Sequence, residues 1–157
     1  MKVTAVAKPN ANSPQRIRAV HFIDIENLVG RGLLSLEEVQ EVHRRYIEKI
    51  EVSQDDVFFV ASGPQNRAAV VLGWPGSLCK FKKGADGADF ALLSLFHEFD
   101  ALSCASEFFI GSGDQRFAEI GNICRQAGKP VTVVTGVGAI SYRLRPFPNV
   151  DLLGAAA

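Results

Sequence analysis

Short apolar runs alternate along this chain with segments of helical periodicity, and the alternation restricts the possible folds more than any other feature. Five runs have strand character: AVHFIDI at 19–25, VFFVAS at 57–62, SLCKF at 77–81, EFFIGS at 107–112 and VTVVT at 131–135. Strands that alternate with helices pair in parallel through right-handed crossovers. The sequence therefore predicts an α/β fold, a three-layer α/β/α sandwich around a central parallel sheet of the Rossmann-like kind.

The segments between these runs carry helix signals. Ser35 and Glu38 form a capping-box pattern, and apolar residues follow at helical spacing as far as Ile50. Further helices are predicted at 64–74, at 88–99 after a loop over 82–89, and at 113–129. In the last of these, Gly128 ends the helix and four residues face the core: Phe117, Ile120, Cys124 and Ala127. A short basic helix at 138–147 and a last strand at 149–153 complete the prediction.

The chain is expected to hold one domain at 19–157, after a flexible N-terminal arm at 1–18 that contains Pro, Asn and Ser. Lys plus Arg and Asp plus Glu both number 17, so binding to a polyanion requires a local patch. No apolar run reaches membrane-spanning length, and the N-terminal one is too short for a signal peptide. Three scattered cysteines favour reduced thiols in a cytoplasm over disulfides or a structural zinc.

Polar residues gather where the predicted strands end. They are Asp24, Glu26 and Asn27 after the first strand, Asp86 and Asp89 after the third, and Ser112, Gly113 and Asp114 after the fourth. The carboxyl ends of parallel strands share one edge, where ligands bind in α/β sheets. Two carboxylates at 4 Å repel by about 4 kcal/mol at an effective dielectric of 20. They therefore share a proton or hold a hard cation such as Mg²⁺ or Mn²⁺, which can activate water beside a phosphate.

Four pieces of the sequence, in their order and spacing, resemble the NYN group of PIN-like ribonuclease domains. They are FIDIENL, KKGADGADFALL, FFIGSGDQRFAEI and GKPVTVVT, and their order and spacing match the family across residues 20–145. The resemblance implies a parallel sheet of strand order 3-2-1-4-5. It also implies acidic residues that hold Mg²⁺ or Mn²⁺ for the cleavage of RNA phosphodiester bonds.

The resemblance gives Asp24, Asp86 and Asp114 the catalytic role and the role of metal ligands. Asp89 lies one helical turn after Asp86 and is the expected fourth acid of the metal site. Asn27 would position substrate or a ligand, and Ser112 would support Asp114. Many members have S-G-D-x-D-F where this chain has S-G-D-Q-R-F, so Arg116 replaces an acid. Arg116 then either weakens metal binding or holds a phosphate itself.

Each acid also has a structural explanation. Asp24 can cap the turn into 26–30, and Asp86 and Asp114 can favour a helix dipole. A solvated helix face explains Asp89 equally well. Positive residues flank the predicted edge: Lys82, Lys83, Arg143 and Arg145. Gripping RNA phosphates is favoured slightly over protection of a sheet edge against aggregation.

Two functions of different classes follow from this pattern. The first is a Mg²⁺- or Mn²⁺-dependent endoribonuclease, and the alternative is a catalytically inactive module that binds RNA or a protein. A nucleotide-binding function ranks last, because neither a P-loop nor a dinucleotide fingerprint is present. RNA is the expected partner, and no membrane is. Leu152 and Leu153 suggest a homodimer contact, and some PIN-like toxins pair with a regulatory protein.

Overall fold

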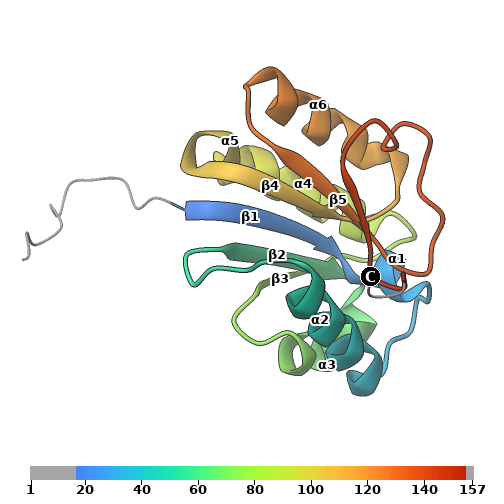
Figure 1. Cartoon of the computed structure of the whole chain (residues 1–157). Helices are drawn as coiled ribbons and strands as arrows, with labels where there is room; N and C mark the ends of the chain where they lie inside the picture. Colours follow the sequence, from blue (N-terminus) through green and yellow to red (C-terminus); the bar gives the residue numbers. More distant parts are fainter. Residues whose placement is uncertain (1–16, 155–157) are drawn as a thin grey trace, which may run out of the picture.

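The computed structural model describes residues 17–154, which form a single six-stranded parallel sheet between two layers of helices (Figure 1). The strand order is β3-β2-β1-β4-β5-β6. The strands are β1 Ile17–Asp24, β2 Val57–Ser62, β3 Leu78–Phe81, β4 Ala105–Gly111, β5 Val131–Thr135 and β6 Asn149–Asp151. The predicted α/β/α sandwich is confirmed, and the order of the first five strands is the one that the resemblance implied.

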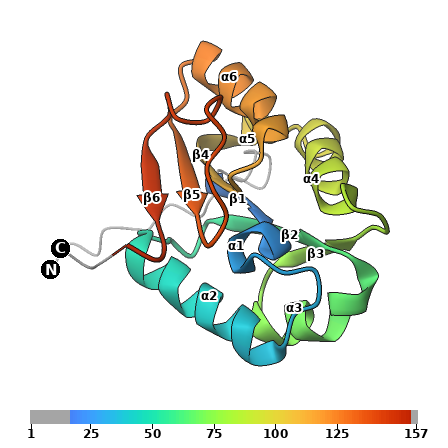
Figure 2. The same cartoon turned by 90° about the vertical axis from the view of Figure 1, so that its right-hand side faces the viewer.

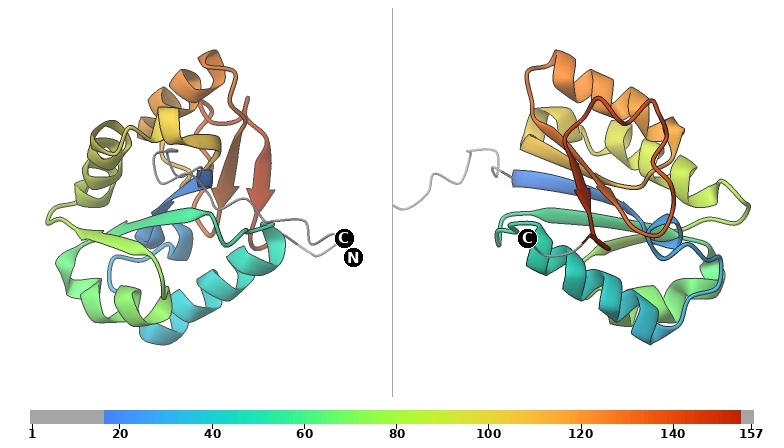
Figure 3. Two further views of the ribbon diagram at one scale, coloured as in Figure 1. Left: turned by 90° about the vertical axis from the view of Figure 1, so that its left-hand side faces the viewer. Right: turned by 45° about the vertical axis from the view of Figure 1, so that its right-hand side comes forward.

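Helices cover both faces of the sheet, and they differ in length. They are α1 Ile25–Val29, α2 Leu36–Lys49, α3 Arg67–Gly73, α4 Gly87–Glu98, α5 Ala101–Cys104 and α6 Ala118–Gln126, with 3₁₀ turns η1 Pro64–Asn66 and η2 Gln115–Phe117. Helices α2 and α3 cover one face, and α4 and α6 cover the other (Figure 2). Helix α5 lies at the amino end of β4, opposite the edge where the strands end (Figure 3). Helix α1 follows β1 directly and occupies that carboxyl edge.

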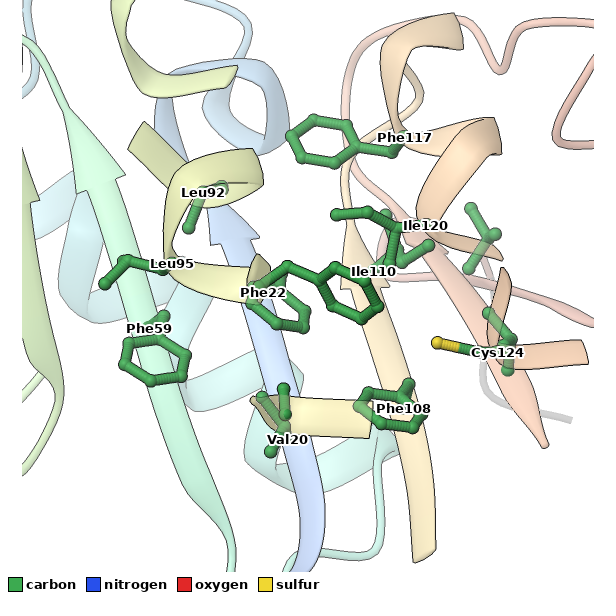
Figure 4. Packing of buried hydrophobic residues seen from close by; sticks show 14 of the residues in the cluster. Val20, Phe22, Phe59, Leu92, Leu95, Phe108, Ile110, Phe117, Ile120 and Cys124 are labelled. Carbon is green, nitrogen blue, oxygen red and sulfur yellow. The ribbon is translucent and has the colours of Figure 1, made fainter. Parts of the chain in front are cut away.

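Side chains of the central strand alternate between two hydrophobic clusters, because successive residues of a strand point to opposite faces. Val20 and Phe22 pack on the α4 and α6 side together with Leu92 and Ile120 (Figure 4). Ala19 and Ile23 pack on the other side with residues of α1, α2 and α3. Each fully buried side chain of this size contributes about 1.5–3 kcal/mol. The sheet edge that carries the polar residues is therefore built on a rigid, two-sided core.

A buried polar cluster lies on the α2 side of β1, between the aromatic rings of Phe58 and Phe109, whose centroids are 4.2 and 4.5 Å from the His21 ring. The Tyr46 hydroxyl bonds His21 Nδ1 at 2.6 Å, and His21 Nε2 bonds Asp56 Oδ2 at 2.9 Å. Burial lowers the pKa of His21 to about 4. The imidazole is thus neutral, accepts from Tyr46 and donates to Asp56. Both partners of His21 come from segments far away in the sequence, which no local pattern of residues indicates.

Several predicted boundaries agree with the structure. The strands at 57–62 and 131–135 match β2 and β5. Ser35 caps α2 in a full capping box, in which its hydroxyl accepts from Glu38 N and Glu38 accepts from Ser35 N. Strand β1 begins at Ile17, two residues before the predicted domain start, and residues 1–16 of the predicted arm lie outside the described part of the chain.

Other predicted elements were wrong. Segment 138–147 is not a helix but a series of turns, because Pro146 interrupts it and its backbone bonds neighbouring loops, with Ser141 N donating to Gly113 O at 2.8 Å. The backbone N–H groups of Leu144 and Phe147 each close a turn, and both side chains are buried in the core. The helix predicted at 113–129 is a 3₁₀ turn followed by α6, which ends at Gln126. Ala127 is therefore exposed rather than in the core.

The region from residue 17 to residue 154 contains no helix with the length and apolar character needed to cross a bilayer. Leu152 is buried in the core, so it is not available for the predicted contact between copies, whereas Leu153 is half exposed.

Candidate functional site

The carboxyl edge of the sheet carries the acids that the sequence singled out. Asp24 is the last residue of β1 and caps α1, and Asp89 lies in the first turn of α4. Asp114 follows β4 and caps η2, while Asp86 is the residue before α4. Figure 2 faces this edge, with α1 between the layers. Elements from three separate parts of the chain thus deliver carboxyl groups to one end of the sheet.

Asp24 and Asp89 form a buried pair at this edge, with only 6% and 5% of their surface exposed. Burial and a hydrogen bond with Asp89 raise the pKa of Asp24 to about 8. Asp24 therefore keeps a proton at neutral pH and donates it to Asp89. Asp24 Oδ1 also accepts from the backbone N–H of Asn27 at 3.3 Å, which is the capping role that the sequence allowed. Asp24 thus caps α1 and at the same time belongs to the buried acid pair.

Asp89 carries the negative charge of this pair. Burial is the main cause that raises its pKa, and the charge of Asp114 adds to the effect. The hydrogen bonds from Asp24 and from Arg116 act in the opposite direction, and Arg116 Nη1 lies 3.0 Å from Asp89 Oδ2. Asp89 is thus held between a proton donor on one side and a guanidinium group on the other.

Asp86 behaves differently from Asp89, although the sequence prediction ranked it higher. Its side chain is 47% exposed, and Arg116 Nη1 lies 2.5 Å from its Oδ1. Arg116 lowers the pKa of Asp86. The helix begins at Gly87, where a Cβ would collide with the carbonyl oxygen of Lys82, so α4 approaches β3 closely. Asp89 therefore lies buried in the first turn of the helix, whereas Asp86 precedes the helix and stays at the rim of the site.

Asn27 and Ser112 hold the loop that carries Asp114. Asn27 Oδ1 accepts from Gly113 N at 2.9 Å, and the buried Ser112 hydroxyl accepts from Asp114 N at 3.1 Å. Asp114 Oδ1 in turn accepts from Arg116 N at 2.9 Å. Ser112 and Asn27 thus both hold the backbone around Asp114 by hydrogen bonds.

Glu26 does not join the acid pair. Its Oε2 accepts from the backbone N–H of Gly63 at 2.8 Å. It lines a hollow of about 610 Å³ beside Asn27, whose wall contains glycines of several loops, including Gly30 and Gly84. Glu26 connects α1 to the loop after β2, a structural role.

The fit of a divalent cation depends on how many carboxyl groups converge. Among residues 17–154, no group of three or more His, Cys, Asp or Glu side chains is arranged to hold a metal ion. The two buried carboxyl groups of Asp24 and Asp89 suit Mg²⁺, which commonly binds one or two protein carboxylates and keeps waters or substrate phosphates as its other ligands. Arg116 already neutralises part of their charge. The donor set thus fits a two-carboxylate site.

Positive and aromatic residues line a groove that shares Arg116 with the acid pair. Arg116 and Arg143 line an open groove of about 870 Å³ with Arg125 and Phe90, two residues that the sequence reasoning missed. The sequence held one signal for Phe90, because this aromatic residue directly follows Asp89 at the start of a predicted helix. The remaining predicted residues contribute less to this groove: Lys82 lies beside Phe90, and Lys83 and Arg145 are exposed but do not line it.

Comparison of the chain with protein-family models, with curated proteins and with solved structures found no match. The resemblance to the NYN group therefore stays a prediction, and a proposed function depends on the site's own residues.

Proposed function

We propose that this protein is a metal-dependent ribonuclease that hydrolyses RNA phosphodiester bonds at the carboxyl edge of its sheet. The observation that carries the proposal is the buried pair of Asp24 and Asp89. Burying two adjacent carboxyl groups costs stability even though Arg116 neutralises part of their charge, and such perturbed groups concentrate at functional sites. Their position at the strand ends is where α/β sheets bind ligands.

The residues at the carboxyl edge of the sheet would have different roles. Asp24 and Asp89 would hold Mg²⁺ or Mn²⁺, and Asp114 adds negative charge near Asp89. Asn27 and Ser112 fix the loop of Asp114. The ion, when bound, would supply an activated water and neutralise charge on the phosphate. The chain's own contribution would be a pair of pre-positioned carboxyl groups, which would have to give up their shared proton for a cation to bind.

A polyanionic substrate fits the charges around the acid pair. Three arginines line the adjacent groove, and Lys82 lies beside Phe90, which also lines it. Guanidinium groups bind phosphate oxygens well, because their planar donors match phosphate geometry. RNA as the polymer follows from the resemblance to the NYN group. The three cysteines are free thiols, which suits a reducing cytoplasm.

A catalytically inactive RNA-binding or protein-interaction module is the second candidate, and Arg116 favours it. One guanidinium nitrogen contacts both Asp86 and Asp89, at 2.5 and 3.0 Å. This contact satisfies carboxylate charge that a divalent cation would otherwise neutralise. In that case the edge binds phosphate through Arg116 and cuts nothing.

Calorimetry with Mn²⁺ and cleavage of a labelled RNA separate the two candidates. We expect Mn²⁺ binding and metal-dependent cleavage by the wild type. Asp24→Asn and Asp89→Asn should abolish both, whereas Asp55→Asn, in an exposed loop at the far end of the sheet, should change neither. RNA binding without metal binding or cleavage would establish the inactive module. Undiminished cleavage by both site variants would assign the activity to a contaminant.

A further inference from the structure

The groove beside the acid pair has features that the proposed hydrolysis does not require. It runs between α4 and α6 and is closed on one side by the loop that precedes β6. Its wall includes Phe90, Leu93, Arg116, Arg125, Arg143 and Pro146. It starts at the site itself, because Phe90 follows Asp89 in α4 and Arg116 contacts the Asp89 carboxylate.

The groove is positively charged. Its lining contains three arginines and a single acid, Glu119. Arg116 is paired with Asp86 and Asp89, but within residues 17–154 neither Arg125 nor Arg143 forms an ion pair with a carboxylate. Arg125 instead donates to the Asn122 side chain at 3.1 Å and lies over a phenylalanine ring. Two guanidinium groups along the groove are thus available to phosphates.

An exposed aromatic ring stands at the end of the groove nearest the acids. Half of the surface of Phe90 is exposed, although core positions of α4 are close by. Lys82 Nζ lies 5.4 Å and Arg116 Cζ 5.7 Å from the centre of its ring. Exposed aromatic rings between cations are the platforms on which single-stranded nucleic acids stack their bases. Tyr142, beside Arg143, is exposed in the same way.

We propose that single-stranded RNA lies along this groove, with phosphates at Arg125 and Arg143 and one base stacked on Phe90. The phosphate next to that base would then reach the acid pair, and this last step rests on the proposed function. A duplex cannot bind in this way, because its bases are stacked on one another and reach Phe90 only after unpairing. The groove therefore selects unpaired RNA as the substrate class.

Binding is tested without cleavage, by fluorescence anisotropy in EDTA with an RNA strand of about 12 nucleotides, a length that covers the site of a typical single-strand binder. The wild type should bind the single strand at least roughly tenfold more tightly than the duplex of the same sequence. Phe90→Ala should weaken single-strand binding by roughly tenfold, and Phe90→Tyr should restore it. Arg125→Gln and Arg143→Gln should each lower the salt dependence of binding by about one ion.

Arg44→Gln is the matched control, because Arg44 lies on the outer face of α2 and pairs with Glu41 and Glu48. It should leave RNA affinity unchanged. Equal affinity for duplex and single strand, or unchanged binding by Phe90→Ala, would overturn the proposal. An equal loss in Arg44→Gln would also overturn it, since any surface charge would then suffice.

A small diester, bis(4-nitrophenyl) phosphate, separates this inference from the ribonuclease proposal. The diester has no strand to place in the groove, so its hydrolysis by the wild type with Mn²⁺ tests the ribonuclease proposal alone. The anisotropy measurements in EDTA test the groove alone, because no cleavage occurs there. Absence of hydrolysis by the wild type, with single-strand binding still dependent on Phe90, would support the groove and contradict the ribonuclease.

Discussion

The guanidinium group of Arg116 donates to the buried carboxylate of Asp89, with Nη1 3.0 Å from Oδ2. The same nitrogen lies 2.5 Å from Asp86 Oδ1, so one cation joins an acid at the rim to the acid inside the site. A positive charge is thus already fixed beside Asp89, in the place to which the carboxylate would attract a divalent cation. A metal ion bound at Asp89 would therefore have to compete with Arg116 for the same charge.

Removing this cation should strengthen metal binding. We expect Arg116→Ala to bind Mn²⁺ roughly tenfold more tightly, because the variant lacks a positive charge that repels the dication. Calorimetry measures the change. Arg125→Ala removes an equal charge that contacts no acid and should have a much smaller effect. An unchanged affinity in Arg116→Ala would show that the guanidinium does not compete.

The Asp24 proton should make stability depend on pH. A carboxyl group whose pKa rises from 3.8 to about 8 on folding keeps its proton in the folded state, while the unfolded chain loses it. The free energy of unfolding therefore falls as pH rises through this window, by about 1.4 kcal/mol per pH unit at most, and levels off above it. The raised pKa of Asp89 acts in the same direction.

Asp24→Asn carries no titrating proton and retains an amide that can donate to Asp89. Urea unfolding between pH 5 and pH 9, a range that spans the raised pKa of about 8, should show a flatter dependence for this variant than for the wild type. The variant should also be the more stable of the two at the alkaline end. Parallel curves for the two proteins would mean that Asp24 does not hold the proton.

The buried His21 and Asp56 pair should contribute to stability rather than to activity. Asp56→Ala removes the acceptor of His21 Nε2 and leaves a buried N–H without a partner, which costs about 2–3 kcal/mol. Asp56→Asn should cost less, because its amide oxygen can accept and because Asp56 Oδ1 already lacks a partner. Urea unfolding measures both. Asp55→Ala, at the exposed neighbouring position, should change stability by at most about 0.5 kcal/mol.

The capping box of α2 gives a local test of helix stability. Ser35→Ala removes the hydroxyl that accepts from Glu38 N at 3.1 Å, and the free energy of unfolding should fall by about 1 kcal/mol. Ser35→Asp should preserve most of the stability, because an aspartate also caps. A loss in Ser35→Asp equal to that in Ser35→Ala would attribute the effect to something other than the cap.

The sequence by itself determined the elements and the layered architecture of this protein. Apolar runs and helical periodicity act over a few neighbouring residues, so they located β2 and β5 at their boundaries and the cap of α2 at Ser35. The same local rules placed acids at the carboxyl ends of strands. They failed at 138–147, where backbone bonds to the Gly113 loop and buried side chains replace helical ones.

The tertiary structure alone decided which of those acids meet. Asp89 rather than Asp86 pairs with Asp24, because α4 begins at Gly87, packed closely against Lys82, so that Asp86 precedes the helix and Asp89 lies in its buried first turn. The partners of Arg116 and of His21 likewise come from segments far away in the chain. Such pairings depend on strand order and helix position, which no short stretch of residues encodes.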